Sequence, residues 1–179
     1  MNHADALALL SAAIPSATGG TWADVGAGGG TFTRALASLV GPTGRVYAVD
    51  ADPRAVATLG RLPSDPASAP VVAMHGDVAA PLGLSPLDGI VLANVLHFVA
   101  DGADALALIA GQLRPGGRLV LIEYENRAPS RWVPYPVAFK RFQALAAEAG
   151  LSSPALVATR PSAYGGDLYV ASATRVAES

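Results

Sequence analysis

A cluster of glycines near the start of the chain constrains the fold more than any other feature. The cluster lies at residues 26–30, between a short apolar run that begins at Trp22 and a helical pattern of apolar residues that begins at Phe32. This order of strand, glycine turn and helix directs backbone N–H groups at the helix start toward a ligand. Glycine suits the turn because a Cβ would hold the ligand away from the backbone and would disfavour positive φ. The sequence therefore predicts a ligand site at the turn.

A second apolar run, at residues 46–49, ends at Asp50 and predicts another buried strand. The carboxyl ends of parallel strands lie along one edge of a sheet, so we expect Asp50 beside the glycine turn. A carboxylate there can accept two hydrogen bonds from the vicinal hydroxyls of a ribose. Asp50 could instead cap the following helix, but Asp52 before Pro53 already suits that position. We therefore predict a cofactor that carries a nucleoside.

Strands and helices alternate along the rest of the chain, which predicts an α/β fold with a doubly wound, mostly parallel sheet. Hydrophobic residues make up 51% of the 179 residues and charged residues only 15%, which fits a sheet covered on both faces. We expect one domain over residues 1–179, without an internal repeat. The later strands are expected at residues 71–74, 90–93, 119–122, 156–159 and 168–173, and helices at residues 6–14, 53–60, 101–113 and 137–149. A hairpin turn is expected at residues 164–167.

Charge and composition exclude several classes of function. The net charge is −2 and the basic residues are scattered, so no nucleic-acid partner is expected. The absence of cysteine excludes disulfides and thiol nucleophiles, and His3, His75 and His97 lack the spacing of metal ligands. Residues 1–19 lack the basic start of a secretory signal and are predicted to form a short packing helix. No run is long and apolar enough to predict a membrane span, so we expect a cytoplasmic protein.

Five motifs occur in order along the chain, each at the end of a predicted strand. They are Asp24-Val25-Gly26-Ala27-Gly28-Gly29-Gly30, Asp50, Gly76-Asp77-Val78, the strand at residues 88–94, and Leu113-Arg114-Pro115-Gly116-Gly117. In this order they resemble the class I S-adenosylmethionine-dependent methyltransferases, whose first motif reads D/E-x-G-x-G-x-G and whose last reads L-x-P-G-G. The resemblance covers nearly the whole chain, from about residue 21. It implies a seven-stranded sheet in the order 3-2-1-4-5-7-6, with strand 7 antiparallel and helices on both faces.

The resemblance also implies that S-adenosylmethionine is the cofactor and S-adenosylhomocysteine its product. The residues that would bind it are Asp24, Gly26, Ala27, Gly28, Gly30, Asp50, Ala51, Asp77, Val78 and Asn94. The glycines would let the backbone approach the methionine part and the sugar, and Asp24 would help to place the amino group. Asp50 would hold the ribose hydroxyls. Asp77 would accept from the adenine amino group, Val78 would offer its N–H to the ring, and Asn94 would lie near the methionine end.

Only about twenty residues precede the first predicted strand, whereas many small-molecule methyltransferases have lid helices there. A lid could come only from the N-terminal helix and from the loop at residues 125–136, which could form a substrate flap. That loop contains Arg127, Arg131, Trp132 and Tyr135. They could line an acceptor site for an anionic or aromatic substrate, or they could form an amphipathic cover over the core. The short lid leaves the substrate class open and suggests a homodimer that completes the pocket.

Methyl transfer from a sulfonium is an in-line displacement, so the protein contributes mainly proximity, alignment and exclusion of water. A general base is needed only if the acceptor must lose its proton early. His97 follows the fourth predicted strand and is the best candidate base, or else a partly buried histidine that caps the loop. Glu123 and Tyr124 end the fifth strand at the same edge and are the other candidate catalytic residues. They could instead be a strand-end carboxylate and a packed ring.

We therefore predict an S-adenosylmethionine-dependent methyltransferase that acts on a small-molecule acceptor. A first alternative is a catalytically silent scaffold or regulatory subunit that only binds the cofactor, because the lid is short. An NAD-dependent oxidoreductase fits less well, since from Gly26 and Gly28 the last position of G-x-G-x-x-G falls on Thr31. A macromolecular acceptor is a further alternative, because an open site can admit a protein or RNA.

Overall fold

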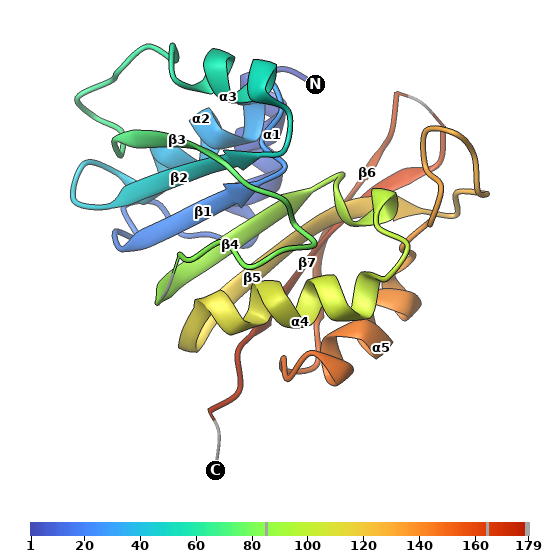
Figure 1. Ribbon diagram of the computed structural model, residues 1–179. Coiled ribbons are helices and arrows are strands. Elements are labelled where there is room, and N and C mark those ends of the chain that lie inside the picture. The colour runs from blue at the N-terminus through green and yellow to red at the C-terminus, as the bar shows by residue number, and fades with distance from the viewer. Residues whose placement is uncertain (85, 164, 178–179) are drawn as a thin grey trace.

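The computed structural model describes residues 1–84, 86–163 and 165–177. Within these residues seven strands form one sheet in the order β3-β2-β1-β4-β5-β7-β6 (Figure 1). They are β1 (Thr21–Val25), β2 (Arg45–Asp50), β3 (Val71–His75), β4 (Leu87–Ala93), β5 (Leu113–Glu125), β6 (Ala155–Pro161) and β7 (Asp167–Thr174). β7 runs antiparallel to both of its neighbours, and the other paired strands are parallel. The predicted strand order and directions are confirmed.

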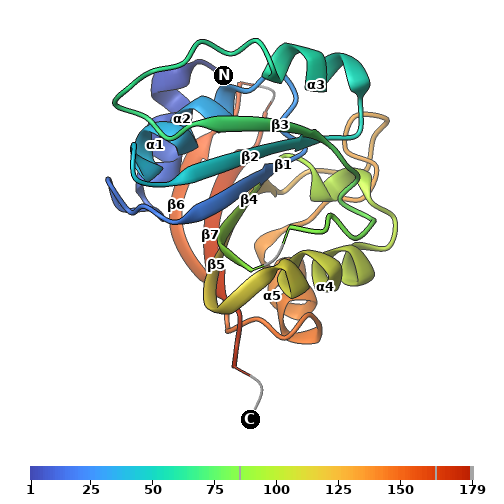
Figure 2. The same ribbon diagram turned by 60° about the vertical axis from the view of Figure 1, so that its left-hand side comes forward.

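Helices cover both faces of this sheet. They are α1 (His3–Ser11), α2 (Thr31–Val40), α3 (Pro53–Leu59), the 3-10 turn η1 (Leu96–Phe98), α4 (Gly102–Gln112) and α5 (Phe139–Glu148). α1, α2 and α3 lie on one face, and α4 and α5 lie on the other (Figures 1 and 2). The sheet is therefore the middle layer of three.

Alternate side chains of each central strand enter two separate hydrophobic cores. Ile90 and Leu92 of β4 pack in the core with α4 and α5, whereas Val91 between them packs in the core with α1 and α2. Burial on both faces is typical of the central strands of a parallel sheet. It also fixes the register, because a slip by one residue would exchange the two faces. The carboxyl ends of β1 to β4 are thereby held along one edge.

Local capping signals set the starts of two helices. Asp52 caps α3 as predicted, because its side chain accepts a hydrogen bond at 2.9 Å from the N–H two residues later and Pro53 follows it. α1 begins at His3 rather than near residue 6. The cause is Asn2, whose side chain accepts from the N–H of Asp5 at 2.8 Å and so caps the helix earlier than the apolar pattern suggested.

The largest difference from the predicted elements is in β5. The strand begins at Leu113 rather than at residue 119. Leu113 pairs with Leu87, and the register with β4 then shifts so that Gly89 pairs with Arg118. This irregularity takes up the extra residues of the Pro-Gly-Gly segment. The segment therefore ends α4, as expected, without delaying the strand.

β6 and β7 form an antiparallel pair that reaches from Ala155 and Ser172 to Pro161 and Asp167. The hairpin turn expected at residues 164–167 includes residue 164, which lies outside the described residues. Within the described part of the chain, no helix combines the length and the apolar character needed to cross a membrane.

Candidate functional site

The carboxyl end of β2 meets the glycine turn at the edge where the sequence predicted it. The N–H of Gly28 donates to Asp50 Oδ2 at 2.7 Å, and Asp50 Oδ1 accepts from a second backbone N–H at 2.9 Å. The start of the turn is also tied to β2, because the N–H groups of Gly26 and Ala27 donate to the carbonyl of Val49 at 2.8 and 3.0 Å. The Asp50 carboxylate is thus held against the turn.

Two positions in the turn require glycine, each for a different reason. Gly26 has a φ of 77°, and a Cβ there would lie 2.2 Å from Cγ2 of Val95. Gly28 has a φ of 54°, and a Cβ there would meet no atom within 4 Å. Gly26 is therefore needed for packing, whereas Gly28 leaves open space in which a ligand can approach the backbone.

A cavity of about 240 Å³ opens at this edge of the sheet, and we call it the strand-end cavity. Its lining includes six of the predicted cofactor-binding residues, namely Gly26, Asp50, Ala51, Asp77, Val78 and Asn94. The other four predicted residues, which do not line it, are Asp24, Ala27, Gly28 and Gly30. Three further lining residues were not predicted as site residues: Gly76, Val95 and Phe98. Gly76 belongs to the third sequence motif, which could have indicated it, whereas no motif pointed to the other two.

Asp24 lies beneath the turn and not in the cavity wall. The residue is 1% exposed, and its Oδ2 accepts a hydrogen bond from Thr33 Oγ1 of α2 at 2.6 Å. Burial raises the pKa of Asp24 from 3.8 to about 6, and the hydrogen bond from Thr33 offsets only part of that rise. The side chain therefore joins the end of β1 to the start of α2.

Asn94 follows the end of β4 and combines backbone strain with an unsatisfied side chain. Its φ is 57°, a left-handed conformation that non-glycine residues seldom adopt and that is held by the surrounding structure. Its Oδ1 is buried without a hydrogen-bond partner, and the residue lines the strand-end cavity. A buried acceptor without a donor costs about 1–3 kcal/mol. A ligand that donates a hydrogen bond there, such as the amino group of a cofactor, would remove this cost.

A histidine and a glutamate form a buried hydrogen-bonded pair near this cavity. His97 is 2% exposed and Glu123 0%, and His97 Nδ1 lies 2.7 Å from Glu123 Oε2. The other carboxylate oxygen accepts from the backbone N–H of His97 at 3.2 Å. An ionised carboxylate can only accept, so Nδ1 is the donor to Glu123, and in the neutral form of the ring the lone pair is then on Nε2. Such a fixed tautomer is what an oriented general base requires.

The three predicted catalytic residues, His97, Glu123 and Tyr124, are brought together at this edge. The ring centroids of His97 and Tyr124 are 5.7 Å apart, and those of His97 and Phe98 are 4.3 Å apart. Phe98 also lines the strand-end cavity. A chain of ring contacts therefore leads from the cavity wall through His97 to Tyr124.

The loop at residues 125–136, which we call the flap, is held against these rings. The N–H of Tyr135 donates to the carbonyl of His97 at 2.9 Å, and Val133 is buried in the core. The guanidinium Cζ of Arg127 lies 4.8 Å from the centroid of the Tyr124 ring. The flap is thus both a cover packed on the core and a surface that presents charged and aromatic groups beside His97.

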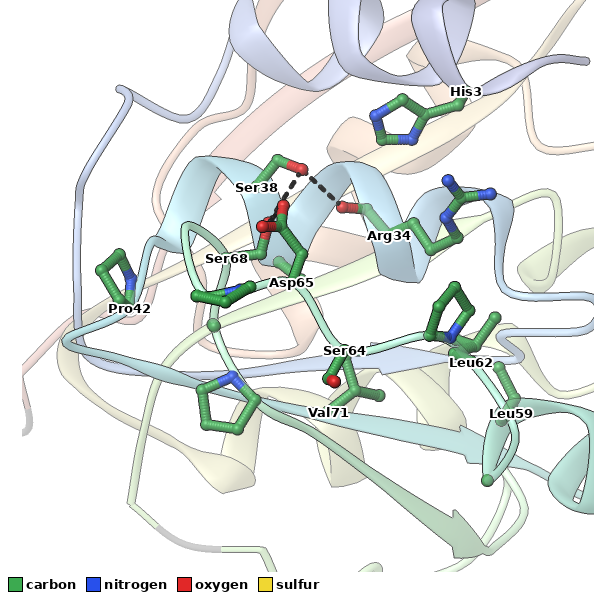
Figure 3. Close-up of a pocket in the computed structure, with 16 residues that line it drawn as sticks. His3, Arg34, Ser38, Pro42, Leu59, Leu62, Ser64, Asp65, Ser68 and Val71 are labelled. Carbon is green, nitrogen blue, oxygen red and sulfur yellow. Dashed lines mark hydrogen bonds between the residues drawn. The ribbon is translucent and has the colours of Figure 1, made fainter.

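A larger cavity, of about 600 Å³, lies between α1, α2 and the loop after α3, and we call it the helix-side cavity (Figure 3). None of its lining residues comes from the carboxyl end of a strand. Neither cavity offers a metal site, because the described residues contain no group of three or more His, Asp or Glu that could hold one. We therefore place the candidate functional site at the strand-end cavity.

Comparison with known proteins gives one family match and two relatives that this chain matches over part of their length. A family model described as a methyltransferase domain matches residues 23–121, which is more than half of the chain. An uncharacterized 37.1 kDa protein of a Streptomyces fradiae transposon is 37% identical over 113 residues, which are 62% of this chain and 32% of that protein. A ubiquinone/menaquinone biosynthesis C-methyltransferase of Ectopseudomonas mendocina is 32% identical over 105 residues, which are 58% of this chain and 41% of that protein. The chain spans about a third to two fifths of the length of these two relatives.

A solved structure shares the fold over almost the whole chain. It is the 1,6-didemethyltoxoflavin-N1-methyltransferase of Burkholderia thailandensis, with 1,6-didemethyltoxoflavin and S-adenosylhomocysteine bound. The TM-score is 0.70 at 24% identity, over 98% of this chain and 78% of that chain. At this identity the likeness concerns the fold alone.

Proposed function

The chain belongs to the methyltransferase domain family of S-adenosylmethionine-dependent enzymes, and on that premise we propose that it methylates a small-molecule acceptor. The observation that carries this proposal is the Asp50 carboxylate, held at the glycine turn by the N–H of Gly28 at 2.7 Å. Asp50 stands in the wall of a cavity that is also lined by residues following β3 and β4. The ribose, adenine and amino acid parts of one cofactor could all be bound around that space.

S-adenosylmethionine is the cofactor, and its sulfonium supplies an activated methyl group. Asp50 can bind the ribose without leaving the turn, because each carboxylate oxygen has two lone pairs and uses one of them on a backbone N–H. Asp77 and Val78, after β3, are proposed to hold the adenine. The unpartnered Oδ1 of Asn94 is proposed to accept from the amino group.

We assign the role of general base to His97, with Glu123 as its positioning residue. Because Nδ1 donates to Glu123, Nε2 can take the proton from an acceptor O–H or N–H as the nucleophile attacks. The carboxylate of Glu123 also stabilises the imidazolium that results. Tyr124 packs beside the base at 5.7 Å and is proposed to position the acceptor.

Two observations favour a small acceptor over a macromolecule. The net charge of −2 and the scattered basic residues give little attraction for nucleic acid. The flap also packs against the ring of Tyr124 and the backbone of His97, so a macromolecular acceptor would have to displace the flap to reach the base. A homodimer that completes the pocket stays a prediction.

Calorimetric titration with S-adenosylhomocysteine and with NAD tests the cofactor, and release of S-adenosylhomocysteine over a panel of small phenols and amines tests the reaction. We expect S-adenosylhomocysteine to bind and to raise the melting temperature, and we expect turnover with at least one acceptor. Binding of NAD in its place would contradict the proposal. Tight binding of the product with no turnover over the panel would favour the scaffold alternative.

A further inference from the structure

We propose that the acceptor is a single-ring aromatic acid. Its anionic group is bound at Arg127, and the hydroxyl or amino group that receives the methyl is bound at His97. The inference rests on the proposed function, because it names the substrate class of the same site. It is carried by an unpaired cation in the flap, by the spacing between that cation and the base, and by the aromatic groups that surround them.

Arg127 lacks a counter-ion among the described residues. Its Nε is buried and has no hydrogen-bond partner. The two carboxylates closest in the chain are already engaged: Glu123 is paired with His97 at 2.7 Å, and Glu125 Oε2 accepts from the N–H of Phe139 at 2.8 Å. The guanidinium therefore carries a charge without a carboxylate partner, and an anionic group that binds its terminal nitrogens gains hydrogen bonds and a charge partner. The flap therefore presents an anion site.

The spacing between Arg127 and the base limits the length of the acceptor. The Arg127 Cζ is 4.8 Å from the Tyr124 ring centroid, which is 5.7 Å from that of His97. The sum of these distances, 10.5 Å, is the largest separation of Cζ from the His97 ring centre. A single-ring acid that makes a hydrogen bond of about 3 Å at either end reaches at least that far. It can therefore contact both groups, and no longer spacer is needed between them.

The side chains between these two ends favour a flat apolar body. Phe98 is 56% exposed, lines the strand-end cavity and lies 4.3 Å from the His97 ring. Tyr135 is 40% exposed, and its backbone is bound to the carbonyl of His97. Aromatic side chains around a pocket stack on or pack edge-on against another ring. A ring bound there would cover the exposed face of Phe98 and would bring the acceptor atom close to the cofactor cavity.

The flap contains a second arginine that serves as a matched control. The guanidinium Cζ of Arg131 lies 4.4 Å from the centroid of the Trp132 ring, and Trp132 is 68% exposed. Arg131 is itself exposed and has no buried unpartnered nitrogen among the described atoms. Removing it takes the same charge from the same loop without touching the buried nitrogen of Arg127.

The experiment is a calorimetric titration of the full chain, which is first saturated with S-adenosylhomocysteine. The titrants are 3- and 4-hydroxybenzoate and the neutral 3- and 4-hydroxybenzamides. We expect at least one acid to bind at least tenfold more tightly than its amide, because only the acid carries a negative charge that can pair with Arg127. Arg127→Gln should reduce the affinity for the acid to that for the amide and leave the affinity for S-adenosylhomocysteine unchanged. Arg131→Gln should keep the preference for the acid, and Arg127→Lys should restore part of it.

Several outcomes would overturn the inference and leave the proposed function standing. They are equal binding of acids and amides, no binding of either by the product-saturated protein, or equal losses in Arg127→Gln and Arg131→Gln. A concentration-dependent dimer that Trp132→Ala dissociates, with no acid preference, would assign the flap to a second copy of the chain. Failure of S-adenosylhomocysteine itself to bind would contradict the proposed function, and the inference with it.

Discussion

The helix-side cavity is more than twice as large as the strand-end cavity, about 600 Å³ against about 240 Å³. The two cavities differ, however, in how far their polar groups are already hydrogen-bonded within the protein. In the helix-side cavity, Asp65 accepts from Ser68 Oγ at 2.8 Å and from a backbone N–H at 3.0 Å (Figure 3). Its His3 Nδ1 is buried without a partner, but no strand-end carboxylate accompanies it. In the strand-end cavity, Asn94 Oδ1 is unpaired beside Asp50, which keeps free lone pairs. Hydrogen-bonding capacity gathered at strand ends, rather than volume, distinguishes the site.

Removing one carboxylate from each cavity is the strongest test of this difference between the two cavities. Asp50→Ala should weaken binding of S-adenosylhomocysteine about 100-fold, because two charge-assisted hydrogen bonds to the ribose are lost at about 1.5 kcal/mol each. Asp65→Ala removes the same charge from the helix-side cavity and should leave the dissociation constant unchanged. Calorimetry on both variants measures the difference. Similar losses in the two variants would mean that the larger cavity also takes part in binding.

A smaller effect is expected from adding a methyl group at Gly28. Gly28→Ala and Gly150→Ala both place a Cβ in open space at positive φ, 54° and 71°. Each should lower the free energy of unfolding by about 1 kcal/mol, because a left-handed backbone is unfavourable for alanine. Only Gly28→Ala should also weaken S-adenosylhomocysteine binding, about tenfold, because its Cβ enters the space over the turn. Equal affinities in the two variants would show that the cofactor does not approach Gly28.

The contact between the glycine turn and Asp50 could be predicted from the sequence for a topological reason. Gly28 and Asp50 are 22 residues apart but meet, because the carboxyl ends of adjacent parallel strands share one edge. The resemblance to the class I methyltransferases is confirmed, as are the strand order and S-adenosylmethionine as cofactor. Alternation could also have placed Asp24, which lies two residues after Trp22. Both side chains point to the α2 face, where Asp24 meets Thr33 and not the cavity.

Other parts of the site depend on contacts that no local pattern reveals. Phe98 lines the cavity because η1 turns back after β4, and η1 is held by hydrogen bonds from His97 to Glu123, 26 residues away. Likewise, the sequence alone shows Arg127 only as one of several charged residues in a loop. Its buried, unpaired nitrogen becomes evident only when the flap is packed on Tyr124. Both features follow from tertiary packing, which the residue spacing does not encode.

The smallest expected effect is on the pH dependence of stability. It distinguishes the buried carboxylate under the glycine turn from the exposed carboxylate in the helix-side cavity. The pKa of Asp24 in the folded protein is about 6, above its ordinary 3.8, because burial disfavours the charged form. The native state therefore binds this proton more tightly than the unfolded state, and the resulting stabilisation is complete below about pH 4 and lost as the pH rises through 6. Between pH 5 and pH 7, the wild type should lose on the order of 1 kcal/mol relative to Asp24→Asn.

Urea denaturation at pH 5, 6 and 7 measures this difference, and Asp65→Asn is the control. The pKa of Asp65 is lowered from 3.8 by the N–H of Ala67 and then by the hydroxyl of Ser68. Asp65 is therefore ionised in the folded and unfolded states throughout this range, and Asp65→Asn should parallel the wild type. Asp24→Asn keeps an oxygen that can accept from Thr33, so its difference from the wild type isolates the charge. A wild type that parallels Asp24→Asn as well would show that Asp24 is already ionised in the native protein at pH 5, and that burial under the turn costs it little.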